Sequence, residues 1–256
     1  MSLAAGWHRF AWNEAVARWA EHAAGAAAVA MADPKNAGWY RGEGTWFVGV
    51  DCLPNDADGR LPGGPPLNGA FRGVIPDGAL HPAQISAVFP GYPRPVEGES
   101  EAASRYRRVR DGAHVDGLLP VGLERRRRMQ EPHRYILGLP LTENAPGASP
   151  LVVWEGSHEI LRRAFAEALE PHPREAWHEV DLTDIYQATR REVFDICQRV
   201  ELPGQVGEAV LLDPMILHGI APWSSEETGP RVVAYFRPQT DIATWLRGAH
   251  AWFPDG

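Results

Sequence analysis

The chain has few cysteines and no long apolar run. Its only cysteines, Cys52 and Cys197, have no CxxC partner for a structural zinc, and they predict free thiols in a reducing, cytoplasmic setting. The alanine-rich stretch 23–32 is shorter than the roughly 20 apolar residues that cross a bilayer. Met1-Ser2-Leu3 does not begin like a secretory signal. We therefore expect no membrane partner.

Positive charge is also scarce. The 256 residues carry 25 basic and 33 acidic side chains, a net charge of −8. Nucleic-acid binding would require a clustered basic excess, so we expect no nucleic-acid partner. Lys35 is the one lysine, and four arginines stand together at positions 125–128. Charge runs of this kind are most often solvated loop faces. A lid that recognises an anionic substrate is the alternative interpretation.

Short strands separated by turns predominate after residue 45. We expect one domain over residues 1–256, with an N-terminal helical segment 1–45 and a β core 46–256. Apolar residues at three- and four-residue steps predict a helix at 12–30, and the Pro- and Gly-rich stretch 54–78 predicts a long surface loop. The expected strands are 46–50, 84–89, 106–110, 134–139, 151–154, 209–212 and 231–236.

A helical pattern interrupts these strands at about residues 157–202. Residues 160–169 and 182–200 predict two helices, with Thr183 as the N-cap of the second. Many short strands with one helical insertion predict a mainly β fold with helices (α+β), built as a sandwich or a barrel.

Several catalytic motifs are incomplete. His158 and His178 are each followed by glutamate, as in zinc proteases, but Arg162 and Leu182 stand where the second histidine is required. The chain also has no GxSxG elbow and no Walker loop. The sequence therefore argues against these enzyme classes.

The pair His114 and Asp116 is the first candidate for a metal site. Residues two apart on an extended backbone face the same side, so both side chains can aim at one ion. Ten histidines and 33 acidic residues give about one H-x-[DE] match by chance. A turn histidine at a strand end is therefore the alternative for His114.

A second histidine completes the candidate site. His218 follows the apolar strand 209–212, and Arg231 opens the next strand thirteen residues later. Two histidines and one carboxylate form a facial triad, which holds Fe(II) and leaves three coordination positions open. An arginine near such a site can bind a carboxylate with two parallel hydrogen bonds.

The order of these segments resembles the phytanoyl-CoA dioxygenase-like (PhyH) branch of the Fe(II)/2-oxoglutarate-dependent dioxygenases. The resemblance covers roughly residues 84–238. It is carried by the H-x-D pair, by Gly156-Ser157-His158, by a G-[DE]-x-V-L-L-D-P-x-x-x-H segment and by the arginine after it. Glu155 stands where the family usually has proline, and Ile220 stands where several relatives have a small hydroxyl residue.

The resemblance implies a double-stranded β-helix, a cupin-like jelly-roll barrel. It implies His114, Asp116 and His218 as iron ligands and Arg231 as the partner of the distal carboxylate of 2-oxoglutarate. With O2 as the other co-substrate, the implied reaction hydroxylates a small molecule and releases succinate and CO2. Halogenating relatives have a small residue in place of the carboxylate, so Asp116 favours hydroxylation. We interpret His158 as a helix cap outside the metal site.

Weaker candidates and other functions stay open. Arg134 and Tyr135 are candidates for the co-substrate pocket, although an exposed charge and a core aromatic explain them equally simply. Trp154 and Trp223 are candidates for a substrate cavity, although tryptophans at such strand ends are more often simple core. The alternative functions are a cupin-type metalloenzyme that does not use 2-oxoglutarate, despite the lack of H-x-H, and a non-catalytic β-barrel binding protein. The sequence does not indicate an oligomeric state.

Overall fold

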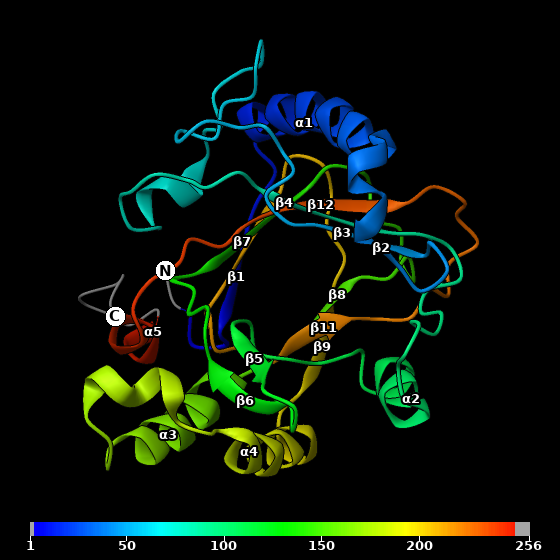
Figure 1. Ribbon diagram of the computed structural model, residues 1–256. Helices are drawn as coiled ribbons and strands as arrows, with labels where there is room; N and C mark the ends of the chain where they lie inside the picture. Colours follow the sequence, from blue (N-terminus) through cyan, green and yellow to red (C-terminus); the bar gives the residue numbers. More distant parts are fainter. Residues whose placement is uncertain (1–2, 249–256) are drawn as a thin grey trace.

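Two antiparallel sheets form the centre of the protein. The computed structural model describes residues 3–248, so Met1 and Ser2, on which the expectation of no secretory signal partly rests, lie outside the described residues. The larger sheet has seven strands in the order β1-β10-β7-β12-β4-β3-β2, and the smaller sheet has the order β11-β8-β9. Figure 1 shows the smaller sheet across the interior from β3, β4 and β12. The described strands confirm a mixed α+β fold of mostly antiparallel sheets; the closed barrel stays a prediction.

The elements have the following bounds. The strands are β1 (Trp7–Phe10), β2 (Tyr40–Arg41), β3 (Trp46–Gly49), β4 (Gln84–Val88), β5 (Leu118–Val121), β6 (Arg126–Met129), β7 (Ile136–Pro140), β8 (Leu151–Trp154), β9 (Arg199–Leu202), β10 (Ala209–Leu212), β11 (His218–Ile220) and β12 (Arg231–Phe236). The helices are α1 (Glu14–Ala32), α2 (Glu101–Val109), α3 (Ser157–Leu169), α4 (Thr183–Ile196) and α5 (Ile242–Arg247), with shorter 3-10 turns at η1 (Pro34–Trp39), η2 (Ala70–Gly73) and η3 (Arg174–Glu179).

Helix α1 covers the outer face of the larger sheet. The helix begins after Asn13, whose side-chain oxygen accepts hydrogen bonds from the N–H groups of Ala15 and Val16. Trp19 is fully buried and its ring lies 6.0 Å from that of Phe236 on β12. Figure 1 shows α1 above β4 and β12. Burial of this apolar helix face therefore stabilises the sheet from outside.

A second apolar cluster lies under the helical insertion. It combines Trp154 from β8 with Phe165 from α3, Val193 from α4 and Trp245 from α5, all almost fully buried. Figure 1 shows α3 and α4 beside the smaller sheet. The insertion therefore covers one side of the fold. Separately, none of the described helices is both long enough and apolar enough to span a membrane.

Several sequence predictions were wrong in detail. Residues 106–109 belong to helix α2 and not to a strand, and Arg110 is its C-cap. Ser100 begins the helix by accepting a hydrogen bond from the Ala103 N–H. The helix predicted at 182–200 ends at Ile196, and its last residues instead form β9, which pairs with β8. Leu182, not Thr183, is the N-cap of α4.

The N-terminal segment and the long loop also differ from the prediction. Residues 1–45 contribute two strands besides α1: β1 pairs with β10, and β2 pairs with β3. The stretch 54–78 is not only a surface loop, because Leu61 and Phe71 join the buried cluster beneath α1. Apolar residues scattered among Pro and Gly carry no period, so this burial was not readable from the sequence.

Candidate metal centre

The fold brings His114, Asp116 and His218 together. His218 opens β11, and His114 pairs with it through two backbone hydrogen bonds, His114 N–H to His218 O at 2.8 Å and His218 N–H to His114 O at 3.1 Å. The extended pair predicted at 114–116 is therefore a single bridge and not a regular strand. Gly117 follows with φ +80°, and a Cβ there would collide with the carbonyl oxygen of Glu131. A glycine is thus required where the chain turns away from the site.

The three side chains have the spacing of ligands to one ion. Asp116 Oδ1 lies 3.2 Å from His114 Nε2 and 3.6 Å from His218 Nε2. All three candidate ligand atoms lie within 4.8 Å of one another. Adjacent ligands at a typical metal distance of about 2.1 Å are about 3 Å apart in an octahedral shell. The arrangement therefore fits one metal ion.

Backbone carbonyls orient both imidazoles. His114 Nδ1 lies 3.0 Å from the carbonyl oxygen of Gly112, and His218 Nδ1 lies 3.0 Å from that of Ile216. A carbonyl oxygen only accepts, so each Nδ1 carries the hydrogen. Both Nε2 atoms are then free to donate a lone pair to a metal, which is the usual outer support of a histidine ligand.

Asp116 is a buried carboxylate that keeps its charge. Only 7% of the residue is exposed. Burial by itself would raise the pKa of Asp116, but the charge of Arg237 and contacts with both histidine rings hold that pKa well below its usual range. Arg237 Nη1 donates to Asp116 Oδ2 at 2.8 Å, which leaves Oδ1 facing the histidines.

A small cavity of about 70 Å³ lies at the triad. Its walls include Gln84 and Ser86 of β4, Tyr235 of β12 and Arg237 just after β12. Polar side chains from the larger sheet and His218 from the smaller sheet thus line the same cavity. The cavity can hold a metal and the end of a small polar ligand.

Arg231 lies next to this cavity without lining it. The residue is 3% exposed, and its Nη2 donates to the Tyr235 hydroxyl at 3.1 Å. With the Asn144 amide oxygen turned toward it, Nε donates at 3.2 Å, while Nη1 has no hydrogen-bond partner. Among residues 3–248, no carboxylate forms an ion pair with Arg231. A buried guanidinium without an anion is costly and marks a place for one.

Sequence reasoning missed Arg237 and Tyr235. Both share the inward face of β12 with Arg231, because residues 231, 233, 235 and 237 have the same parity. Gln84 lies opposite Tyr235 in the register between β4 and β12. The sequence signal for Tyr235 and Arg237 was therefore their even spacing from Arg231, which places all three side chains on the same side of the extended chain.

The weaker candidates lie elsewhere. Tyr135 belongs to the buried cluster beneath α1, and Trp154 packs on Phe194 in the second cluster with ring centroids 5.2 Å apart. Trp223 pairs with Ala148 in an isolated bridge outside the triad cavity. Arg134 donates its backbone N–H to Pro238 and does not line the cavity either.

His158 is also separate from the metal centre. It lies in the first turn of α3 and is 3% exposed. The N-cap of that helix is Gly156, so the prediction that His158 caps the helix was wrong. Its exclusion from the metal site agrees with the candidate ligand group found among the described residues.

Comparison with known proteins gives only distant likenesses. No family model and no curated protein matches the chain. EctD from S. alaskensis with 2-oxoglutarate and 5-hydroxyectoine is similar at 16% identity and TM-score 0.46, over 94% of this chain and 74% of that chain. EctD with bound Fe is similar at 13% identity and TM-score 0.44, over 94% of this chain and 74% of that chain.

SnoK, a non-heme alpha ketoglutarate dependent carbocyclase from nogalamycin biosynthesis, is also similar. The identity is 15% and the TM-score 0.32, over 62% of this chain and 50% of that chain. This chain thus spans half the length of SnoK. With identity and TM-score both low, the function has to be argued from the residues of the site.

Proposed function

We propose that the protein is an Fe(II)- and 2-oxoglutarate-dependent dioxygenase that hydroxylates a small molecule. The observation that carries the proposal is the His114, Asp116 and His218 group, with both Nδ1 atoms tied to carbonyls and the ligand atoms within 4.8 Å. The balanced reaction is R–H + O2 + 2-oxoglutarate → R–OH + succinate + CO2. The order of sequence motifs supports the phytanoyl-CoA dioxygenase-like branch.

The donor set fits iron of this kind. Two neutral imidazoles and one carboxylate on one side of an ion leave positions for a chelating co-substrate and for O2. When bound, Fe(II) supplies the electrons that activate O2 for the oxidative decarboxylation of 2-oxoglutarate. The protein's own task is to hold three ligands, bind the organic molecules and exclude water.

Arg231 separates this proposal from a zinc hydrolase with the same ligands. A hydrolase needs a metal-bound water and a base, and no acidic or basic side chain beyond Asp116, Arg237 and the two histidines is among the residues that line the triad cavity. A carboxylate held by Arg231 Nη1 would satisfy the one guanidinium nitrogen that lacks a partner. Tyr235 links Arg231 to the triad cavity, since its ring lines that cavity and its hydroxyl accepts from Arg231. This arrangement supports binding of the distal carboxylate of 2-oxoglutarate.

Arg237 has a different part in the proposed site. Its Nη1 holds Asp116 Oδ2, and its side chain also donates to Gln84 Oε1. The guanidinium therefore fixes the carboxylate plane so that Oδ1 faces His114 and His218. Its role is to position a metal ligand.

Succinate formation tests the proposal. Purified protein is loaded with Fe(II) or with Zn(II), and succinate is measured after addition of 2-oxoglutarate and O2 in the presence of a metabolite panel. We expect succinate with iron and none with zinc. Iron binding without 2-oxoglutarate binding would overturn the proposal in favour of a cupin-type metalloenzyme, and binding of neither would favour a non-catalytic binding protein.

A further inference from the structure

A second and larger cavity adjoins the triad cavity. Its volume is about 390 Å³, and both cavities are lined by Trp46, His114 and Ile220. The His114 side chain is 51% exposed, whereas the Asp116 and His218 side chains are at most 9% exposed. His114 therefore stands at the boundary between the two cavities, and a molecule in the larger one reaches the metal centre from this side.

The acidic side chains of the larger cavity are already neutralised. Glu99 is paired with Arg107. Asp111 accepts two hydrogen bonds from Arg199, at 2.7 Å and 3.0 Å. Each carboxylate in the wall thus has its own guanidinium, and neither is left to balance a further cation.

Arg127 and Arg190 are the cations that remain. Neither forms an ion pair with a carboxylate among residues 3–248. Arg190 lies over the rings of Tyr106 and Tyr186, at 4.6 Å and 5.1 Å from their centroids. Arg127 Nη1 donates to the Leu118 carbonyl at 3.0 Å, which is a neutral acceptor. The wall therefore carries two positive charges without counter-charges.

The charge of Arg190 acts on Arg127. Burial lowers the pKa of Arg127, and the neighbouring charges of Arg190 and Arg125 lower it further. Arg127 nevertheless stays charged, because a guanidinium is not deprotonated in proteins. An anion between Arg127 and Arg190 would relieve this repulsion.

The backbone around Arg127 is held in place. Arg127 N–H donates to Thr183 Oγ1 at 2.6 Å, and Leu182 N–H donates to the Arg127 carbonyl at 2.8 Å. Arg126 pairs with Asp181 and Asp184. Strand β6 is therefore fixed to the start of α4, which also carries Arg190. The arginine run at 125–128 is thus partly a strand, not the solvated loop face that the sequence favoured.

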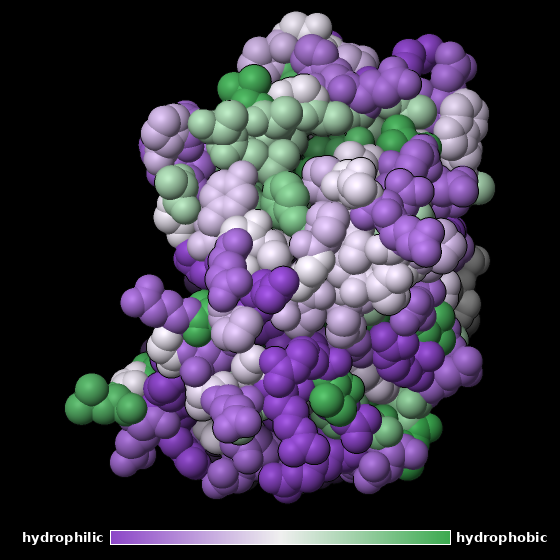
Figure 2. All heavy atoms as spheres, turned by 90° about the vertical axis from the view of Figure 1, so that its right-hand side faces the viewer, coloured by the Kyte–Doolittle hydropathy of each residue, from purple (hydrophilic) through white to green (hydrophobic). Residues whose placement is uncertain are grey.

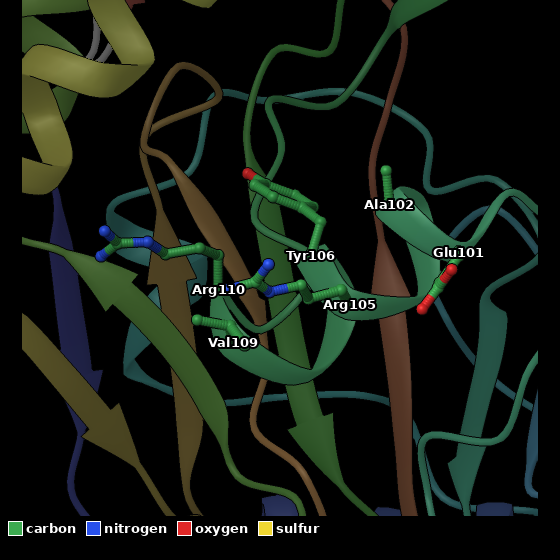
Figure 3. A pocket seen from close by; sticks show the side chains of 6 residues that line it. All are labelled: Glu101, Ala102, Arg105, Tyr106, Val109 and Arg110. Atoms are coloured by element: carbon green, nitrogen blue, oxygen red, sulfur yellow. The ribbon is translucent and has the colours of Figure 1, made fainter.

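Helix α2 forms another wall and has two different sides. Figure 3 shows Tyr106 and Arg110 directed to one side of the helix, with Glu101 at the other end. Tyr106 is common to the larger cavity and to an outer hollow, and its hydroxyl is held by the Ala113 carbonyl at 2.8 Å. Arg105 lines only the outer hollow, which is formed by α2 alone. Figure 2 shows that hydrophilic residues dominate the lower part of this face of the molecule.

We propose that this cavity takes the substrate as an organic anion, with its carboxylate or phosphate between Arg127 and Arg190. Its apolar body would lie on Trp46 and Tyr106, and the C–H bond to be oxidised would lie toward His114. The identity of this molecule as substrate rests on the proposed function, whereas anion binding by the two arginines does not.

Calorimetry with metal-free protein tests the anion site directly. Phenyl phosphate and phenylacetate are the anionic probes, and phenol is the neutral probe. We expect wild-type protein to bind at least one anion at least tenfold more tightly than phenol, since charge-assisted hydrogen bonds are about twice as strong as neutral ones. Comparison of the two anions distinguishes a phosphate from a carboxylate site. Equal affinity for phenol and both anions would overturn the inference without any variant.

Variants then locate the site. Arg127→Gln and Arg190→Gln should each weaken anion binding at least tenfold, and Arg190→Lys should retain more of it than Arg190→Gln. The matched control is Arg105→Gln, which lines the outer hollow and not the larger cavity and should bind as wild type does. Arg231→Met tests the competing location, because the proposed function places a carboxylate at that arginine. An affinity that falls with Arg231→Met, and not with Arg127→Gln or Arg190→Gln, would contradict the assignment.

The two proposals fail separately. Anion binding that depends on Arg127 and Arg190, without succinate formation from 2-oxoglutarate, would leave the anion site standing and remove the oxygenase. Succinate formation without anion binding would remove only the assignment of an anionic substrate.

Discussion

One face of strand β12 packs in the apolar core, and the other face carries polar side chains beside the metal centre. On the outer face Val232, Ala234 and Phe236 are almost fully buried in the cluster beneath α1. On the inner face Arg231 and Tyr235 are hydrogen-bonded to each other beside the metal centre. The two-residue period of a strand thus separates stability from chemistry within six residues. Substitutions on the outer face should mainly lower the free energy of unfolding, and substitutions on the inner face should mainly change the affinity for metal and co-substrate.

The largest expected effect is at Phe236. Phe236→Ala removes a fully buried ring that packs near Trp19, and it should lower the free energy of unfolding by about 3–5 kcal/mol. The neighbouring Tyr235→Phe removes only the hydroxyl and should cost about 1 kcal/mol. Urea denaturation measures both values. Equal losses in the two variants would break the distinction between the faces.

The two inner arginines should respond oppositely to removal. Arg237→Met leaves the buried Asp116 carboxylate without its cation and should cost about 2 kcal/mol of unfolding free energy, since Arg237 is itself partly exposed. Arg231→Met removes a buried cation that has no carboxylate, so stability should stay equal or rise. Thermal melts of the metal-free proteins measure the difference. A larger loss in Arg231→Met than in Arg237→Met would show that Arg231 has a structural role.

Ligand binding by the same two variants sharpens this comparison. Arg231→Met should weaken 2-oxoglutarate binding by roughly 2–3 kcal/mol, or about 30- to 150-fold, and leave Fe(II) binding close to wild type. Arg237→Met should weaken Fe(II) binding, because Asp116 loses its orientation. Calorimetry under anaerobic conditions measures both. Equal weakening of both ligands by Arg231→Met would place that residue at the metal and not at the co-substrate.

The smallest expected effect lies away from both faces, at Asp181. Although burial opposes it, hydrogen bonds from Thr183 and Arg126 lower the pKa of Asp181 to about 2. A lowered folded-state pKa contributes stability that is complete above the unfolded pKa near 4 and is lost as the pH falls toward 2. Asp181→Asn should therefore cost less than about 1 kcal/mol at pH 7, because the pair is exposed. Its difference from wild type should shrink as the pH falls from 4 to 2 and vanish below the folded-state pKa of about 2, and a constant difference over that range would contradict this account.

Regular strands were the most predictable part of the fold. The strands Leu151–Trp154, Ala209–Leu212 and Arg231–Phe236 were predicted with their observed bounds, because short apolar runs lie between turn residues. Helix α2 was missed because a cap at Ser100 and not an apolar period begins it. Strand β1 was missed because its register with β10 depends on a contact distant in sequence.

The metal centre was more predictable than its surroundings. Three ligand residues in a known order led to His114, Asp116 and His218, which the fold brings together. Arg237 has the parity of Arg231 but lies one residue past the strand, so the signal that it carries is weak. Arg190 is one of many arginines on helices and carries no local signal. Arg237 meets Gln84 only because β12 pairs with β4, and Arg190 lies near Arg127 only because β6 is held against the start of α4.

Anaerobic titration with Fe(II) and 2-oxoglutarate is the most direct test of the account. Chelation of the metal by 2-oxoglutarate should give a weak visible charge-transfer band in wild-type protein. His218→Ala should abolish the band, and the exposed His172→Ala, outside the candidate ligand group, should retain it. A folded wild-type protein without the band, or a His218→Ala variant that keeps it, would contradict the assignment of this triad.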